Sequence, residues 1–216
     1  MVARHNPTGI DPTLAQWQQF ADFCQQRKLI PFIDMAYQGF ADNPDDDAAG
    51  LRLIVEQCEL VLLATSCSKN MGLYCERTGA TSIITQDKKQ HKDLRSMLEI
   101  IARANYSMPP NHGSAIASLL LNNPKPWLEE LSVCRDRIAN IRQLIGDKLV
   151  AINAPDSLNA IAKQKGMFSM LPLTALQMNK LRDQFAIYGL PNGRINLAGL
   201  KTSQVDELVK ALIAVI

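Results

Sequence analysis

Three short, predominantly apolar runs constrain the fold more than any other feature of this sequence. They occupy residues 29–34, 60–65 and 81–85, and an amphipathic helical pattern separates the first from the second. A strand that is apolar at every position is typical of a parallel sheet with helices on both faces. The sequence therefore predicts an α/β fold with a mostly parallel, doubly covered sheet, and antiparallel additions at its edge stay open.

Helical patterns account for much of the remaining chain. Thr13 and Gln16 form a capping-box signature before a helix that runs to about residue 28. Further helices are expected over residues 47–58, 89–105 and 114–121. The helix over residues 124–151 keeps its apolar period throughout. A helix of that length often bridges two domains.

The pattern changes after the long helix. Short strands at residues 167–170 and 195–197 alternate with helices at 173–185 and 203–215, as in a small α+β domain. We therefore expect the C-terminal part of a large domain over residues 1–135 and a small C-terminal domain over residues 136–216.

Composition excludes several classes of protein. The 216 residues are 47% hydrophobic and 20% charged, which is ordinary for a globular protein. A net charge of +2 with interspersed signs argues against a nucleic-acid or membrane-surface partner. Without a membrane-length apolar run or a signal-peptide core, the expected compartment is the cytoplasm. The five cysteines include no C-x-x-C pair, so we expect reduced thiols and no metal site.

Several polar residues follow the predicted strands. Asp34 and Tyr37 come after the first strand, Lys69 comes after the second, and Arg77 lies shortly beyond it. Taken singly, each has an ordinary role as a turn former, a half-buried ring or a solvated charge. The carboxyl ends of parallel strands share one edge, however, so these side chains are expected to converge. Together they suggest a lysine that becomes a nucleophile, a carboxylate for a ring cation and an arginine for a phosphate.

Seven ordered segments make this interpretation specific. They are HNPTG at 5–9, DMAYQGF at 34–40, SCSKN at 66–70, ERTG at 76–79, RANYSMPPNHG at 103–113, GMFS at 166–169 and GRINLAG at 193–199. In this order and at these spacings, the chain resembles the fold-type I pyridoxal-phosphate aminotransferases. Within them it is similar to the class I aspartate and aromatic amino-acid aminotransferases. The similarity runs from His5 to the C-terminus.

The resemblance implies a role for each residue around the cofactor ring. Lys69 matches the lysine that holds pyridoxal 5′-phosphate covalently and moves the substrate proton. Asp34 matches the aspartate that pairs with the pyridinium nitrogen and keeps it protonated. Tyr37 and Asn6 match the pair that hydrogen-bonds the phenolic oxygen, and Asn6 also faces the substrate. In this family the peptide bond between Asn6 and Pro7 is expected to be cis.

The resemblance also implies the phosphate and substrate contacts. Ser66 and Arg77 match two phosphate ligands. Arg194 matches the arginine that binds the substrate α-carboxylate, to which a planar guanidinium is suited. Arg103 matches the arginine that reaches into the partner subunit of a homodimer and binds a side-chain carboxylate. Phe168 lines the substrate side of the site.

The implied reaction is transamination between an L-amino acid and a 2-oxo acid such as 2-oxoglutarate, with ping-pong kinetics. Arg103 suits dicarboxylates, but aromatic-accepting relatives keep this arginine too, so a broad aromatic and aspartate specificity is slightly favoured over strict aspartate specificity. A decarboxylase or lyase that uses the same cofactor is a further possibility. Arg194 argues against decarboxylation, because it would hold the carboxylate and align the Cα–H bond for cleavage.

Family members carry a long stretch before the HNPTG segment, including a phosphate-binding loop and part of the sheet. We therefore expect this chain to be the C-terminal portion of such an enzyme, with weak phosphate binding, an unpaired sheet edge and an uncovered apolar face. The alternative is a non-catalytic remnant that binds a partner subunit through the dimer surface. The intact set of Asn6, Asp34, Tyr37, Lys69, Arg77 and Arg194 favours the enzyme.

Overall fold

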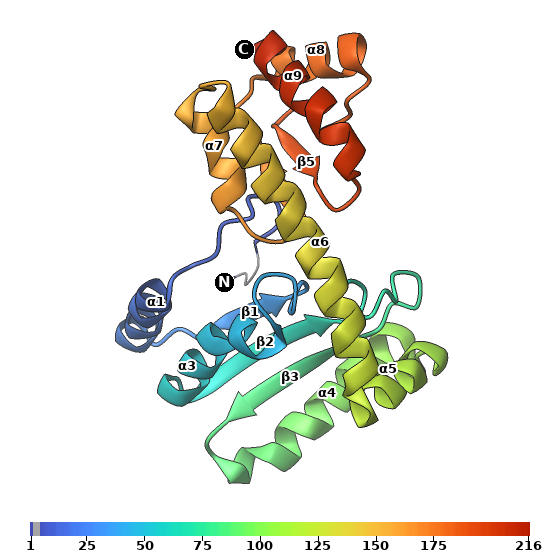
Figure 1. Ribbon diagram of the computed structural model, residues 1–216. Coiled ribbons are helices and arrows are strands. Elements are labelled where there is room, and N and C mark those ends of the chain that lie inside the picture. The colour runs from blue at the N-terminus through green and yellow to red at the C-terminus, as the bar shows by residue number, and fades with distance from the viewer. Residues whose placement is uncertain (2–4) are drawn as a thin grey trace. The chain divides into compact units, whose positions relative to one another are not determined.

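The computed structural model describes residue 1 and residues 5–216 (Figure 1). The chain forms two compact units. The first contains Met1 and Pro12–Leu131, and the second contains residues 5–11 and Ser132–Ile216. Helix α6, Pro124–Ala151, contributes residues to both units and has the bounds expected from the sequence. The domains 1–135 and 136–216 remain a prediction about the family's architecture.

A three-stranded sheet forms the centre of the first unit, in the order β1 (Phe32–Met35), β2 (Leu60–Ser66) and β3 (Gly79–Thr85). Strands β1 and β2 are parallel, whereas β2 and β3 are antiparallel. The α/β class is as expected, but the described sheet is mixed rather than mostly parallel. The reason is the connection: two helices lie between β1 and β2, whereas a loop without a helix returns the chain from β2 to β3.

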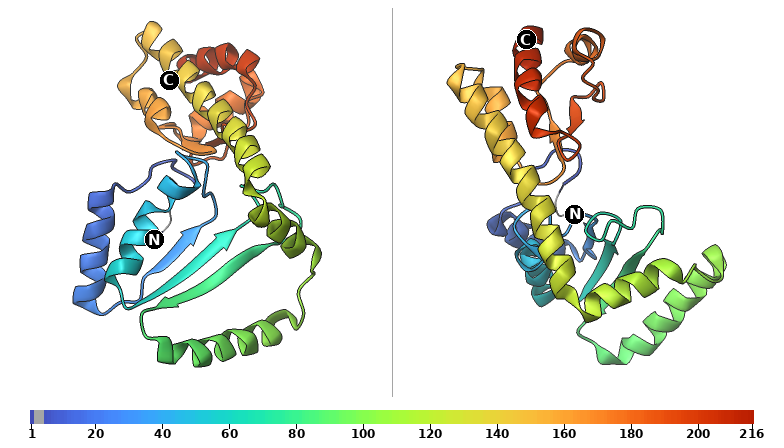
Figure 2. Two further views of the ribbon diagram at one scale, coloured as in Figure 1. Left: turned by 60° about the horizontal axis from the view of Figure 1, so that its bottom comes forward. Right: turned by 45° about the vertical axis from the view of Figure 1, so that its right-hand side comes forward.

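Helices α1 (Leu14–Arg27) and α3 (Ala49–Gln57) pack against each other on one face of this sheet, as the left view of Figure 2 shows. Trp17 and Ile54 meet the strand residues Ile33 and Val61 in this core. Residues alternate along β1, so Phe32 points the other way and is 54% exposed. The expectation of helices on both faces is therefore wrong for β1 within the described residues, and an apolar face is open.

The expected unpaired sheet edge is present at β3, which has no further strand beside it among the described residues, whereas part of the β1 edge is paired. The Met1 ammonium donates to the Phe32 carbonyl at 2.8 Å, and the Asp34 amide donates to the Met1 carbonyl at 3.0 Å. These two bonds continue the backbone hydrogen bonding by one residue beyond β1. The first residue of the chain therefore covers part of this edge.

The other helices of the first unit are short or lie at its end. They are α2 (Pro44–Asp47), the 3₁₀ turn η1 (Lys88–Gln90), α4 (His91–Tyr106) and α5 (His112–Asn122). The capping box that Thr13 and Gln16 predicted is present at the start of α1. The bounds of α4 and α5 agree with the sequence prediction to within about two residues, the usual uncertainty of helix ends.

The second unit packs helices around a two-stranded antiparallel sheet. Its elements after α6 are α7 (Asp156–Lys163), β4 (Phe168–Met170), α8 (Ala175–Phe185), β5 (Arg194–Asn196), the 3₁₀ turn η2 (Thr202–Gln204) and α9 (Val205–Val215). Ile145 and Leu149 of α6 meet Leu158, Leu181 and Leu212 in its core. Helix α7 was not expected from the sequence.

Two features are absent from the described residues. No helix there is long and apolar enough to cross a membrane. No group of three or more His, Cys, Asp or Glu side chains there is placed to hold a metal ion.

Candidate functional site

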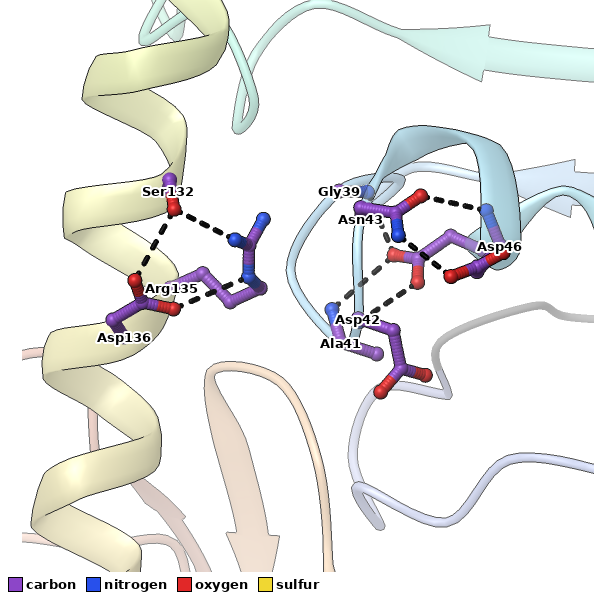
Figure 3. A network of polar contacts seen from close by, with 9 residues as sticks. Gly39, Ala41, Asp42, Asn43, Asp46, Ser132, Arg135 and Asp136 are labelled. Atoms are coloured by element: carbon purple, nitrogen blue, oxygen red, sulfur yellow. Dashed lines mark hydrogen bonds and ion pairs between the residues drawn. The ribbon is translucent and has the colours of Figure 1, made fainter.

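The loop after β1 carries Tyr37 and is fixed by a buried carboxylate that the sequence analysis did not single out. Asp47, at the end of α2, is 4% exposed. It accepts backbone hydrogen bonds from Gly39 at 2.7 Å, Ala41 at 3.2 Å and Asp42 at 3.0 Å (Figure 3). Three backbone hydrogen bonds to one side chain stabilise this turn. The run of acids at residues 45–47 was the available signal for Asp47, but such a run is equally typical of a solvated helix start.

Asp34 itself lies in β1, on the exposed face of the sheet. Its register partner in the parallel strand β2 is Ala64, and Ala64 in turn is opposite Thr81 of β3. The two neighbours are small, and the Asp34 side chain is exposed. The carboxylate is therefore placed at the end of β1, on the open face, two positions before the loop that bears Tyr37.

The predicted nucleophile Lys69 lies in the loop after β2, beside two tyrosines. Its Nζ is 5.5 Å from the centroid of the Tyr37 ring and 4.6 Å from the centroid of the Tyr74 ring. Both distances are within the range of cation–π attraction. The structure thus brings together Lys69 and Tyr37, as their positions after adjacent strands predicted.

Tyr74 is the site residue that sequence reasoning missed. Burial raises the pKa of its phenol above the ordinary value, and the nearby Tyr37 raises it further. The phenol is therefore neutral at physiological pH, and Lys69 faces an uncharged ring. An aromatic residue five positions after the lysine was the only signal, and nothing in the spacing indicates that the loop turns back.

Ser66 and Arg77 lie at the same end of the β2–β3 pair. Ser66 is opposite Gly79 in the register, and the Cys67 amide donates to the Thr78 carbonyl at 2.9 Å just beyond. The Arg77 guanidinium donates to the Tyr74 carbonyl at 2.9 Å, so it braces the loop that carries Lys69. The hydroxyl and the guanidinium expected to bind a phosphate therefore flank one strand end.

Arg103 is placed differently. It lies in the last turn of α4, and its side chain is exposed. Among the described residues it is not part of the cluster that Lys69 forms with the tyrosines. Its predicted role in a partner subunit's site remains a prediction.

In the second unit, Arg194 of β5 stacks on Phe168 of β4. The guanidinium carbon is 4.1 Å from the centroid of the ring. The register pairs Phe168 with Asn196 and Met170 with Arg194, so the two side chains are diagonal neighbours on one face. The Arg194 Nε is buried and has no hydrogen-bond partner among the described residues. A charged donor therefore lies over an aromatic ring, with one buried N–H group that has no partner among the described residues.

The HNPTG turn also belongs to the second unit. The peptide bond between Asn6 and Pro7 is cis, which confirms the expectation, and the Gly9 amide donates to the His5 carbonyl at 2.9 Å. The Gly9 carbonyl accepts from the Lys165 amide at 2.8 Å. Gly9 has a φ of +67°, and a Cβ there would lie 2.7 Å from the Phe168 carbonyl oxygen. Only glycine allows the turn to approach this segment so closely.

The predicted site residues thus fall into two groups, apart from Arg103. Asp34, Tyr37, Ser66, Lys69 and Arg77 lie in the first unit, and Asn6, Phe168 and Arg194 lie in the second.

Comparison with known proteins decides which class of protein this arrangement belongs to. The model of the family "Aminotransferase class I and II" matches residues 3–212. The chain belongs to this aminotransferase family. The aspartate aminotransferase of Escherichia coli (strain K12) is 40% identical over 215 residues, which are 98% of this chain and 54% of the relative. The tyrosine aminotransferase of Rhizobium meliloti (strain 1021) is 42% identical over 207 residues, 94% of this chain and 53% of the relative.

Solved aminotransferase structures agree with this assignment. The aromatic-amino-acid aminotransferase from Burkholderia pseudomallei, covalently bound to pyridoxal phosphate, has a TM-score of 0.95 and 41% identity, and the match covers 100% of this chain and 55% of that one. The aspartate aminotransferase from Trypanosoma cruzi has a TM-score of 0.94 and 44% identity, covering 100% of this chain and 56% of that one. This aminotransferase chain spans about half the length of the relatives it matches.

Proposed function

We propose that this chain carries the lysine-bearing half of an aminotransferase active site, which uses pyridoxal 5′-phosphate to exchange the amino group of an L-amino acid with a 2-oxo acid such as 2-oxoglutarate. The observation that carries the proposal is the position of Lys69. Its amine lies close to two tyrosine rings, in the loop after β2. A similar solved structure, with 41% identity, has pyridoxal phosphate covalently bound.

The described residues fit this cofactor chemically. Lys69 supplies a primary amine for a carbonyl group, and Asp34 supplies a carboxylate for a protonated ring nitrogen on the open face of the sheet. Ser66 and Arg77 supply a hydroxyl and a guanidinium for a phosphate at one strand end. When bound, pyridoxal phosphate supplies an electron sink that acidifies the α-proton of an amino acid.

The chain's own residues would then bind and move protons. The Lys69 Nζ is the group proposed to take the proton from the substrate Cα and to return one in the reverse half-reaction. The Tyr37 hydroxyl and the Asn6 amide are proposed to hydrogen-bond the phenolic oxygen of the cofactor. Asp34 would keep a proton on the ring nitrogen, because a nearby carboxylate favours the charged form.

Arg194 is proposed to bind the substrate α-carboxylate. Its planar guanidinium can donate two parallel hydrogen bonds to two oxygens. Two observations support this role, since the guanidinium carbon lies 4.1 Å from the centroid of the Phe168 ring and the buried Nε has no partner among the described residues. Arg103 is proposed to reach into the partner subunit's site in a homodimer and to bind a side-chain carboxylate there.

Both substrate classes are part of the proposal. The chain is 40% identical to an aspartate aminotransferase and 42% identical to a tyrosine aminotransferase, so similarity does not separate them. We therefore propose that aromatic amino acids and aspartate are both accepted. A non-catalytic remnant that binds a partner subunit is a second candidate, because α4 and α5 expose large apolar side chains, namely Met97, Ile100, Ile101, Leu119 and Leu121.

The test is amino-group transfer by the 216-residue chain saturated with pyridoxal phosphate. With L-aspartate or L-phenylalanine and 2-oxoglutarate, the chain should form glutamate faster than its Lys69→Ala variant does. A rate equal to that of the variant and of free cofactor would contradict catalysis by this chain. Size-exclusion chromatography with a full-length relative then tests the second candidate, which requires a mixed complex.

A further inference from the structure

Arg142, in the middle of α6, is a buried charge that the proposed chemistry does not use. Its side chain is 3% exposed. The guanidinium donates hydrogen bonds to five oxygen acceptors, at distances between 2.6 and 3.3 Å. The acceptors are the carbonyls of Ile161, Lys165, Gly166 and Phe168 and the hydroxyl of Ser169.

These acceptors are all neutral, which makes the arginine costly to bury. Burial lowers the pKa of Arg142 to about 10, so the group is still charged at neutral pH. An apolar side chain would fill the same space without this desolvation penalty. A lysine has three donors around a point, whereas an arginine has five donors in a fixed plane. The side chain is therefore suited to fixing the geometry of several carbonyls at once.

The segment that Arg142 fixes, residues 165–169, supports two predicted site residues. On one side the Phe168 ring carries the Arg194 guanidinium, at 4.1 Å. On the other side the Lys165 amide donates to Gly9, in the turn that contains Asn6, at 2.8 Å. The shortest Arg142 bond, at 2.6 Å, ends on the Phe168 carbonyl, the same atom against which Gly9 is packed.

We propose that Arg142 is a positioning residue, which aims Arg194 at a carboxylate and holds the Asn6 turn through the segment 165–169. The inference rests on the proposed role of Arg194 in binding the substrate carboxylate. Without the planar set of donors, the carbonyls of this segment lose their common partner and the Phe168 ring is free to shift. Arg194 then loses the surface that orients it, although no atom of Arg142 touches the ligand.

A purely structural role predicts a different outcome. Arg142 also bonds the Ile161 carbonyl near the end of α7, so its removal destabilises the second unit in either case. The matched control is Leu212→Ala, which removes a fully buried side chain of the same core in α9. This variant destabilises the unit without changing any partner of the segment 165–169.

The experiment is an NMR titration of the 216-residue chain, labelled with ¹⁵N-arginine, with succinate as the dicarboxylate probe. The Nε–H signal of Arg194 is assigned with the variant Arg194→Lys. In the parent chain this signal should carry a ring-current shift from Phe168 and should move as succinate binds. In Arg142→Met the ring-current shift should collapse, and the succinate Kd should rise by about tenfold or more, the order expected when a binding group is misplaced. The Lys165 amide should also exchange faster with deuterium.

The variants separate the possible results. Arg142→Lys keeps the charge but not the planar set of donors, so it should lose the ring-current shift as well, and it serves as the readout if Arg142→Met does not fold. Leu212→Ala should unfold at a lower temperature with an unchanged shift and Kd. An unchanged shift and Kd in both Arg142 variants would overturn the positioning role. An Arg194 signal in the parent chain that does not respond to succinate would instead overturn the carboxylate role of Arg194, and with it this inference.

Discussion

Two buried charges of opposite sign each support a segment next to site residues, and the segments lie at different distances from them along the chain. In the first unit Asp47 binds the amides of a loop five to eight residues before it. In the second unit Arg142 binds oxygens 19 to 27 residues after it. The first is a local turn that could form early in folding, whereas the second exists only once α6, α7 and β4 have packed together.

Asp47 has a local signal in the sequence, although that signal alone did not single it out as buried, whereas Arg142 has none. Asp47 ends the pattern Asn43-Pro44 followed by three acids, which is a recognisable helix start with a capping asparagine. Arg142 occupies one position in a long amphipathic helix, where arginine is usually solvated. Its burial depends entirely on elements that follow it in the chain.

The largest expected effect comes from removing the guanidinium of Arg142. Arg142→Met should lower the free energy of unfolding of the second unit by about 3 kcal/mol, because several buried carbonyls lose a charged donor together. Amide exchange in β4 and α7 measures the loss. Protection that is unchanged in these two elements would show that the segment 165–169 does not depend on Arg142.

The contact between the HNPTG turn and the segment 165–169 can also be broken by changing the turn. Gly9→Ala places a Cβ 2.7 Å from the Phe168 carbonyl at a φ of +67°, and should cost about 2 kcal/mol. The matched control is Gly166→Ala, which has a φ of +76° but open space around it, and should cost about 1 kcal/mol. Exchange of the Lys165 amide reports on the contact. Equal losses in the two variants would mean that backbone conformation alone, and not the close approach, requires Gly9.

A smaller effect is expected from weakening the hydrogen bonds that Asp47 accepts from the loop before it. Asp47→Asn keeps the shape of the side chain but removes its charge, so the three amide bonds should weaken by about 1 kcal/mol in total. Faster exchange of the Gly39, Ala41 and Asp42 amides would show this. Asp46→Asn is the control, because Asp46 accepts from the exposed Asn43 side chain at 2.6 Å and not from the loop. A similar change in both variants would contradict the role assigned to Asp47.

The smallest effect concerns Tyr74. Because its pKa is raised, the folded state favours the neutral phenol, so the stability that it contributes is complete below the pKa of the unfolded chain and falls as the pH rises through the folded value. Tyr74→Phe should therefore remove the most alkaline component of the tyrosine absorbance titration. If that component persists in the variant, another tyrosine is the one affected by burial.

The sequence predicted the elements of the fold better than their arrangement. The bounds of α6 and the capping box of α1 follow from local signals, and the structure has both. The mixed sheet does not follow, because the direction of β3 depends on a loop whose path no local pattern sets. Helix α7 was missed for a similar reason: it is short, and its buried face, Leu158 and Ile161, is recognisable only against the core that it joins.

In the candidate site, too, one contact could be predicted from the sequence and others could not. The approach of Lys69 to Tyr37 follows from strand order, since both residues come just after neighbouring parallel strands. The approach of Tyr74 needs a loop that turns back toward Lys69, and the stacking of Arg194 on Phe168 needs the register of β4 and β5. Neither can be derived from spacing along the chain.

The most direct test of the proposed function is to locate where pyridoxal phosphate attaches. The 216-residue chain is incubated with the cofactor, treated with borohydride and mapped by peptide mass spectrometry, with Lys69→Arg and the exposed-site variant Lys180→Arg in parallel. We predict that Lys69 is the main modified residue, that the modification disappears in Lys69→Arg and that it is unchanged in Lys180→Arg. Modification spread over the exposed lysines, with Lys69 no more reactive than the others, would contradict the proposal.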